Sequence, residues 1–147
     1  MRTAGISGPV VIQIPGDPKA LFLVRCVVER LANALGFSEQ RVIRLVQAVD
    51  EACSNVIKHG YGGPTRKPLT VTFLVSRERL EIQIQDLAPA PDPQRLIPRD
   101  LRQLRPGGLG LHLIRAGADE VSYEPNEGGT GCLLRLVINR DPGGRRP

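Results

Sequence analysis

Aromatic side chains are scarce in this chain: tryptophan is absent, and phenylalanine and tyrosine together make up 3% of its 147 residues. The formal net charge is +5, which invites a nucleic-acid interpretation. However, much of the excess lies in Arg95, Arg99, Arg102 and Arg105 and at 145–146, where no aromatic residue interleaves to form a stacking surface for bases. The charge therefore indicates a basic loop and tail with no direct nucleic-acid contact, although a polyanionic nucleotide would also suit the loop.

Long apolar segments are also missing. No stretch reaches the roughly 18 consecutive apolar residues of a membrane span, and residues 1–18 lack the apolar core of a signal peptide. We therefore expect a cytoplasmic protein without a membrane partner. The three cysteines, Cys26, Cys53 and Cys132, have no zinc-site spacing and are expected to be buried and reduced. A hydrophobic content of 41% over this length predicts a single domain spanning 1–147.

The first half of the chain predicts one strand and two helices. Residues 10–14 (VVIQI) read as a short strand, and a helix capped by Asp17 with Pro18 in its first turn should end at Gly36. A second helix, capped by Ser38, is expected over 39–59. The apolar residues predicted to face inward are Leu21, Val24, Val27, Val28, Leu31 and Leu35 in the first helix and Val42, Ile43, Val46, Val49, Cys53, Val56 and Ile57 in the second.

The second half predicts mainly strands. Residues 69–76 and 80–86 alternate as a β-hairpin does, and residues 119–139 form a second hairpin around the turn NEGG. Between them, residues 87–106 have no period and are expected to form a lid loop, followed by a glycine turn and a short helix from about Leu111. Residues 140–147 are expected to be disordered. The predicted fold class is α+β: a two-layer sandwich with a mixed, mostly antiparallel sheet and helices on one face, its core over about 10–139.

A row of polar residues on the second helix is the first candidate site. Gln47, Glu51, Asn55 and His59 recur every four residues and therefore share one helix face. Glu51 can accept a proton, and the amide oxygen of Asn55 is a suitable ligand for Mg²⁺. A polar helix edge with a hydrogen bond between Asn55 and Glu51 remains the alternative on these residues alone.

Asp86 and a glycine turn are two further signals. Asp86 follows Leu80, Ile82 and Ile84 at even positions, so it should face the core, where a carboxylate needs donors such as an adenine amino group. Capping of the following turn is an equally open role for it. The glycines at 107, 108 and 110 precede a helix, and free amides at a helix N-terminus bind anions. No Lys-Ser/Thr pair follows them, so this is not a P-loop.

Taken in order, these motifs resemble the ATP site shared by the gyrase, heat-shock chaperone, histidine-kinase and mismatch-repair ATPases. Within that superfamily, DEACSNVIKHGYGG (50–63) and GGLGLHLIRAGADEVSYEPNEGGTGCLLRL (107–136) resemble bacterial anti-sigma-factor serine kinases. The resemblance implies a serine/threonine kinase that uses ATP and Mg²⁺. It also implies two partners, a sigma factor and an anti-sigma antagonist phosphorylated on serine, and a homodimer.

The resemblance also assigns roles to individual residues. Glu51 would be the general base, Asn55 the Mg²⁺ ligand, and Asp86 the adenine-binding residue supported by Thr130. In the lid, Gly108 and Gly110 would line the phosphates, with Leu109 and Leu111 packed beneath; His59 and Tyr61 would be structural. A phosphoacceptor role for His59 is not expected, because histidine kinases place that residue on a separate dimerisation helix.

One position departs from the family, which usually has Asp-x-Gly where this chain has Asp86-Leu87-Ala88. If the backbone there required a positive φ, alanine would cost about 1–2 kcal/mol; if the base lay close, the methyl group would crowd it. Ala88 thus favours a rival function, a module that sequesters a partner with nucleotide as a structural ligand or with none. A third function, ATP hydrolysis coupled to movement as in the chaperones, would require a second domain, which we do not expect.

Overall fold

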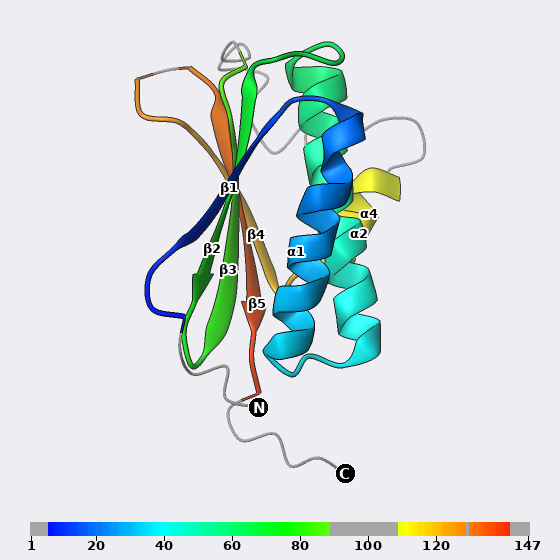
Figure 1. Cartoon of the computed structure of the whole chain (residues 1–147), viewed down its shortest axis with the longest axis vertical. Coiled ribbons are helices and arrows are strands. Elements are labelled where there is room, and N and C mark those ends of the chain that lie inside the picture. Colours follow the sequence, from blue (N-terminus) through cyan, green and yellow to red (C-terminus); the bar gives the residue numbers. More distant parts are fainter. Residues whose placement is uncertain (1–5, 89–108, 129, 142–147) are drawn as a thin grey trace.

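An open antiparallel sheet carries one layer of helices in this computed structural model, which describes residues 6–88, 109–128 and 130–141 (Figure 1). The sheet has five strands in the order β1-β2-β3-β5-β4. They span Val10–Pro15 (β1), Pro68–Val75 (β2), Arg79–Asp86 (β3), Glu120–Pro125 (β4) and Cys132–Asn139 (β5). The α+β sandwich is confirmed, and all strand pairs among these residues are antiparallel, so the sheet is less mixed than expected.

Alternation along the strands explains which face of the sheet is covered. In β2, Leu69, Val71 and Phe73 are fully buried, whereas the intervening residues are half-buried. The same period of two places Leu80, Ile82 and Ile84 of β3 beneath the helices. Both predicted β-hairpins are confirmed, because β2 pairs antiparallel with β3 and β4 pairs antiparallel with β5.

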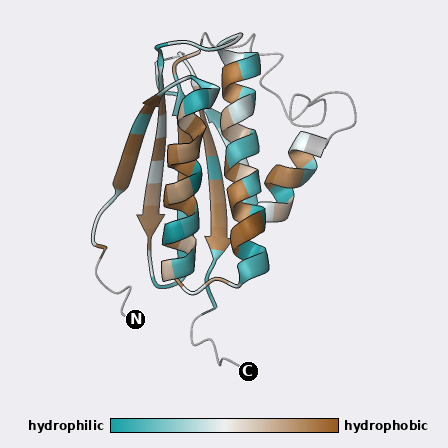
Figure 2. Ribbon diagram, turned by 45° about the vertical axis from the view of Figure 1, so that its right-hand side comes forward, coloured by the Kyte–Doolittle hydropathy of each residue, from teal (hydrophilic) through white to brown (hydrophobic). Residues whose placement is uncertain are grey.

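The helices are amphipathic and pack on that face. They are η1 (Pro18–Ala20), α1 (Leu21–Ala34), α2 (Glu39–Asn55), η2 (Val56–Gly60) and α4 (Leu109–Gly117). Apolar and polar residues alternate along them in Figure 2. Within the described ranges, no helix has both the length and the hydropathy needed to cross a bilayer.

Two predictions of burial were wrong. Ile43 is 52% exposed, because it lies one position past Val42 and so about 100° off the buried stripe of α2, which Leu45 and Ala48 continue instead. Cys26 is exposed, because it lies about 200° around α1 from the buried Val24. The other two cysteines are buried as predicted, and burial raises the pKa of the Cys53 thiol to about 12, so this thiol stays protonated at neutral pH.

The predicted starts of the first two helices are confirmed, with one change in helix type, whereas α4 begins at Leu109, two residues before the predicted Leu111, and includes Gly110. Asp17 accepts a hydrogen bond from the Lys19 amide at 2.9 Å, but it caps the 3₁₀ turn η1, which precedes α1. Ser38 caps α2 by accepting from the Arg41 amide at 3.3 Å. Between the two helices, Gly36 has a φ of +85°, which a residue with a side chain rarely adopts.

The second helix does not continue to residue 59 in the α form. After Asn55 the backbone widens into the π-helical turn η2, and the Tyr61 amide donates to the Val56 carbonyl, five residues back, at 2.9 Å. Single π turns inside helices are rare and occur frequently at functional sites. His59 lies in this turn and is exposed.

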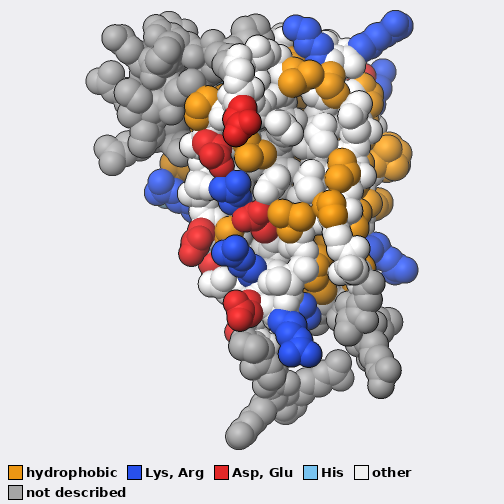
Figure 3. Space-filling model, turned by 90° about the vertical axis from the view of Figure 1, so that its left-hand side faces the viewer, with side chains coloured by type: hydrophobic (Ala, Val, Ile, Leu, Met, Phe, Trp, Pro, Cys, Tyr) orange, Lys and Arg blue, Asp and Glu red, His pale blue; other side chains and the backbone are white. Residues whose placement is uncertain are grey.

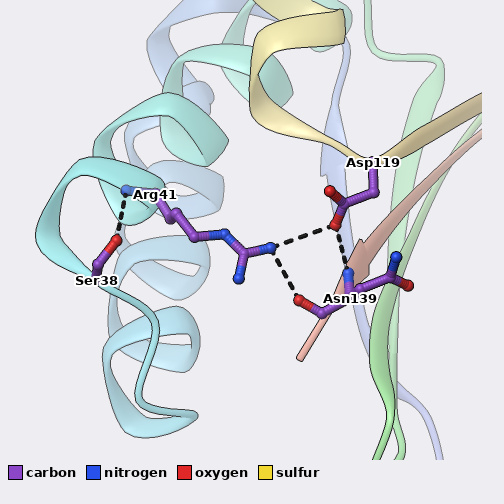
Figure 4. Close-up of polar contacts among 4 residues, drawn as sticks. All are labelled: Ser38, Arg41, Asp119 and Asn139. Atoms are coloured by element: carbon purple, nitrogen blue, oxygen red, sulfur yellow. Dashed lines mark hydrogen bonds and ion pairs between the residues drawn. The ribbon is translucent and has the colours of Figure 1, made fainter. Parts of the chain in front are cut away.

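A polar cluster closes the end of the sheet where α2 begins (Figure 4). The Arg41 guanidinium donates to the Asn139 carbonyl at 2.8 Å and lies 3.3 Å from the Asp119 carboxylate, which accepts from the Asn139 amide at 2.6 Å. Arg41 also lies 4.7 Å over the ring of Phe37. The cluster joins α2 to the end of β5 and to the residues between α4 and β4.

Candidate functional site

The candidate residues gather at the other end of the sheet. The strand register brings the end of β3 and the turn between β4 and β5 to this end, where α2 also terminates (Figure 1). α4 runs antiparallel to α2, since Gly110 lies against Glu51 and Gly117 against Arg44 and Ala48. One end of the molecule therefore carries most of the polar residues singled out by the sequence.

Glu51 and Gly110 are in direct contact. A Cβ atom added to Gly110 would lie 2.6 Å from Oε1 of Glu51, closer than side-chain atoms normally approach. Glu51 is half-buried, so its carboxylate lies between α2 and the first turn of α4 while keeping some access to solvent. The absence of a side chain at residue 110 therefore makes room for the carboxylate proposed as a base.

Asn55 ends α2 with an unsatisfied amide. Its Nδ2 atom is buried and has no hydrogen-bond partner in the described part of the protein. An unpaired buried polar group costs about 1–3 kcal/mol, so a ligand atom at this position would be stabilising. Rotation of the amide by 180° exchanges its two ends, which allows either an N–H toward a phosphate or a carbonyl oxygen toward a cation.

This arrangement fits a Mg²⁺ ion held jointly with a nucleotide. No group of three or more His, Cys, Asp or Glu side chains suited to a metal occurs in the described ranges. Mg²⁺ in nucleotide sites is commonly held by one or two protein oxygens, with phosphates and water completing its shell. Asn55 would supply the protein oxygen, and Glu51 lies one helical turn earlier on the same face.

Asp86 is buried at the end of β3, as its register predicts. It is 5% exposed, and its Oδ1 accepts from the Ala88 amide at 2.9 Å. Burial raises the pKa of the Asp86 carboxyl, while hydrogen bonds from the backbone amides of Ala88 and Cys132 oppose that rise. The bond from Ala88 is a tight turn of the kind considered for this residue, so Asp86 both faces the core and closes the turn that follows.

The methyl group of Ala88 is buried and packs against Gly60. Ala88 is 4% exposed, and a Cβ added to Gly60 would lie 3.3 Å from its methyl carbon, so the two small residues meet where η2 ends. Tyr61 holds the neighbouring backbone: its hydroxyl donates to the Pro68 carbonyl and accepts from the Leu87 amide at 2.9 Å. The contacts of Tyr61 are structural.

Within the described part of the turn, Thr130 is linked to Asp86 through the side chain of Asn126, a residue that the sequence patterns do not single out. Thr130 is exposed, and its carbonyl accepts from Nδ2 of Asn126 at 2.9 Å, while the same nitrogen donates to the Asp86 carbonyl at 2.9 Å. Asn126 begins the turn between β4 and β5, and the turn signal NEGG was the only indication of its importance. The hydrogen bonds of its side chain depend on tertiary structure.

The remaining predicted lid residues are only partly described. Gly108 lies outside the described residues, as does most of the predicted loop 87–106, and of Leu109 only the helical backbone is described. Leu111 is half-buried in α4, the short helix expected from the glycine turn. The expected roles of Gly108 and Gly110 in lining the phosphates, and of Leu109 and Leu111 in packing beneath them, therefore stay predictions.

Comparison with known proteins identifies this arrangement. A family model described as a histidine kinase-like ATPase domain matches residues 14–138. The serine-protein kinase RsbW of Bacillus velezensis is 32% identical over 136 residues, which cover 87% of this chain and 85% of that protein. The serine-protein kinase RsbW of Bacillus subtilis is 29% identical over 136 residues, which cover 87% of this chain and 85% of that protein.

Solved structures agree in fold. The chain matches a structure of the SiaB–SiaC complex of Pseudomonas aeruginosa with a TM-score of 0.68 and 15% identity, covering 88% of each chain. It matches the RsbU and RsbW domains of a Mycobacterium tuberculosis protein with a TM-score of 0.63 and 17% identity, covering 92% of this chain and 34% of that longer one. Together with the match over residues 14–138, these findings show that the chain belongs to the histidine kinase-like ATPase domain family.

Proposed function

We propose that this protein is an ATP-dependent serine/threonine protein kinase that acts as an anti-sigma factor. It would bind a sigma factor and phosphorylate a small anti-sigma antagonist on serine, in the cytoplasm and as a single domain over 1–147. The observation that carries the proposal is the contact of Glu51 with Gly110 near Asn55, whose buried Nδ2 atom has no partner among the described residues, at the end of the sheet that also buries Asp86. The curated relatives named as serine-protein kinases support it.

The chemistry requires positioning more than covalent participation by the protein. The serine oxygen of the antagonist would attack the γ-phosphorus of ATP as the bond to ADP breaks, and the hydroxyl proton would pass to the carboxylate of Glu51. Asp86 would accept a hydrogen bond from the adenine amino group, and Asn55 would bind Mg²⁺. That ion would supply charge neutralisation on the phosphates. Half-burial of Glu51 suits this role, because the incoming serine belongs to another protein and must reach the base.

A homodimer is part of the proposal. β1 lies at the edge of the sheet and pairs only with β2 in the described region, which leaves its other edge available for pairing. Figure 3 shows hydrophobic side chains gathered toward the β1–β2 side of the uncovered face, where Val11 is 56% exposed. On the β5–β4 side, Arg135 pairs with Glu81 and Glu124 at 3.3 and 2.9 Å. The apolar side is therefore the one we expect to pair.

A partner-sequestering module without catalysis is the second candidate, and Ala88 is the feature that favours it. Packing of its methyl against Gly60, and the bond from its amide to Asp86, support a nucleotide site that accommodates alanine. We therefore retain the kinase as the proposed function. The sequestering module becomes the conclusion if nucleotide binds but no phosphate is transferred.

The test combines a binding measurement with a transfer measurement. Mg-ADP at a hundred times its dissociation constant should raise the unfolding free energy by about 2.7 kcal/mol. Labelled phosphate from Mg-ATP should appear on the antagonist recovered by pull-down from the native cell. Glu51→Gln should bind nucleotide normally and lose about 10²–10⁴-fold in transfer rate; Asn55→Ala should weaken both. Binding of nucleotide without transfer by the unaltered protein would contradict the kinase assignment.

A further inference from the structure

The carbonyl group of Asp86 lies just beyond the backbone pairing of two strands. On one side, Asp86 pairs with Leu69 of β2, but on the other side the pairing of β3 with β5 ends at Gln85 and Leu133. The Asp86 carbonyl is bonded there by a side chain instead, Nδ2 of Asn126 at 2.9 Å. The backbone of the residue that would recognise adenine is thus fixed by the turn between β4 and β5.

Asn126 uses every polar group of its side chain in this arrangement. Its Nδ2 donates to the carbonyls of Asp86 and Thr130, each at 2.9 Å, and its Oδ1 accepts from Nε2 of Gln85 at 3.0 Å. Its own amide donates to the Gly131 carbonyl at 3.0 Å. Two donors on one nitrogen beside an acceptor are a property of the carboxamide group, whereas an aspartate here would turn an acceptor toward two carbonyl oxygens.

The other end of the same turn is also in close contact with Asp86. Gly131 has a φ of +82°, and a Cβ atom there would lie 2.0 Å from the Asp86 carbonyl oxygen and 2.6 Å from Nδ2 of Asn126. The next residue, Cys132, is the first of β5, and its amide donates to the Asp86 carboxylate. The turn therefore contacts Asp86 at two points, its carbonyl and its carboxylate.

We propose that Asn126 is a positioning residue for base recognition: by holding the carbonyl of Asp86 against the turn at 126–131, it aims the Asp86 carboxylate at the adenine amino group. This inference rests on the proposed function, in which Asp86 binds adenine. The side-chain polar groups of Asn126 bond Gln85, Asp86 and Thr130, so its effect on the nucleotide would pass through the placement of Asp86. A displacement of about 1 Å in a positioned group is enough to weaken the selectivity of a site.

The test compares ADP and GDP affinities by calorimetry for the unaltered protein, Asn126→Ser, Asn126→Asp and the matched control Glu127→Ala, an exposed neighbour in the same turn. Asn126→Ser should lose about tenfold in ADP affinity with GDP affinity unchanged, which narrows the preference for adenine. Asn126→Asp, the same size with the donor removed, should lose at least as much, and Glu127→Ala should behave as the unaltered protein. In transfer assays, Asn126→Ser should raise KM for ATP and leave kcat near normal.

Three outcomes would overturn the inference, and they differ from a failure of the proposed function. An unchanged ratio of ADP to GDP affinity in Asn126→Ser would show that Asn126 stabilises the turn but does not affect recognition of the base. An equal loss of both affinities together with a lower melting temperature would show general loosening of the fold. A loss of ADP affinity in Glu127→Ala as large as that in Asn126→Ser would show that any change in the turn has this effect. If the unaltered protein binds neither nucleotide, or binds both equally, the assignment of Asp86 itself fails, and this inference fails with it.

Discussion

Two glycines of α4 face α2, and the same substitution at each should have opposite consequences. At Gly110 an added methyl would meet the end of a flexible side chain, Oε1 of Glu51 at 2.6 Å. At Gly117 it would lie 2.4 Å from the Ala48 Cβ and 2.5 Å from the Arg44 carbonyl oxygen. A side chain can rotate away, whereas the backbone and the Cβ of a packed helix cannot. Gly110→Ala should therefore disturb the position of one carboxylate, and Gly117→Ala the packing of the whole helix.

The stability change follows from that difference. Alanine is favoured over glycine inside a helix by about 0.8–1.0 kcal/mol. At Gly110 this gain is offset by about 0.5–1.5 kcal/mol for forcing Glu51 off its rotamer, so the unfolding free energy should stay within about 1 kcal/mol of the original. At Gly117 overpacking costs up to about 3 kcal/mol, which leaves a net loss of about 2 kcal/mol. For a domain of this size, that loss lowers the melting temperature by about 4–8 °C.

Phosphate transfer should respond to the two substitutions in the opposite order, with the larger loss in Gly110→Ala. Gly110→Ala moves the proposed base, so phosphate transfer should fall at least tenfold, up to the roughly 10²–10⁴-fold expected for complete loss of a general base. Combining Gly110→Ala with Glu51→Gln should give no further loss beyond Glu51→Gln, because no base remains to be displaced. The assays are thermal melting, ADP calorimetry and transfer of labelled phosphate to the antagonist.

Two results would refute this reasoning. Full transfer by Gly110→Ala would show that the carboxylate of Glu51 does not need the space above Gly110. A melting temperature for Gly117→Ala equal to that of the original protein would show that α4 and α2 do not approach as closely as Gly117 requires. ADP calorimetry separates a lost base from a lost nucleotide, because only the first leaves ADP affinity intact.

Three further substitutions test other parts of the site and fold. Ala88→Gly removes a buried methyl and frees the backbone, so it should lower the unfolding free energy by about 1–2 kcal/mol in chemical denaturation. Because burial raises the pKa of the Asp86 carboxyl, Asp86→Asn should raise the melting temperature at pH 7; the gain should vanish as the pH falls through the raised pKa toward the ordinary value of 3.8, and a gain independent of pH would contradict this. Arg41→Ala should cost about 1 kcal/mol, since its ion pair with Asp119 is partly exposed, and should leave ADP affinity unchanged because Arg41 lies at the opposite end of the sheet.

The sequence predicts best those features that depend on local periodicity. The hairpin of β2 and β3 and the burial of Asp86 follow from a period of two, and the starts of the helices follow from Asp17 and Ser38. The exposure of Ile43 was not predicted, because an apolar residue beside a buried stripe does not reveal how wide the stripe is. Helix propensities do not predict the π turn either, because nothing in the residue types of η2 distinguishes them from those of a regular helix end.

Within the site, the unpredicted features are tertiary contacts. Asn126 lies 40 residues from Asp86 in sequence, so their hydrogen bond leaves no local pattern, and the residue is indistinguishable from other turn asparagines. The contact of Gly110 with Glu51 likewise depends on how two distant helices cross. Periodicity singles out Glu51, Asn55 and Asp86, and resemblance to a family gives them roles, but the residues that hold them in place are visible only in the structure.

The π turn after Asn55 is equivalent to one extra residue inserted into an α-helix. Removing a residue from Val56–Gly60 would restore the regular helix and leave Glu51 and Asn55, which precede it, in place. Tyr61 would keep about the same direction, because five residues of a π turn and four residues of an α-helix both cover slightly more than one full turn, and its hydroxyl would stay near the Leu87 amide and the Pro68 carbonyl. The extra residue is thus absorbed within one turn, so that the helix carrying the proposed base and metal ligand stays joined through Tyr61 to the strand end that carries Asp86.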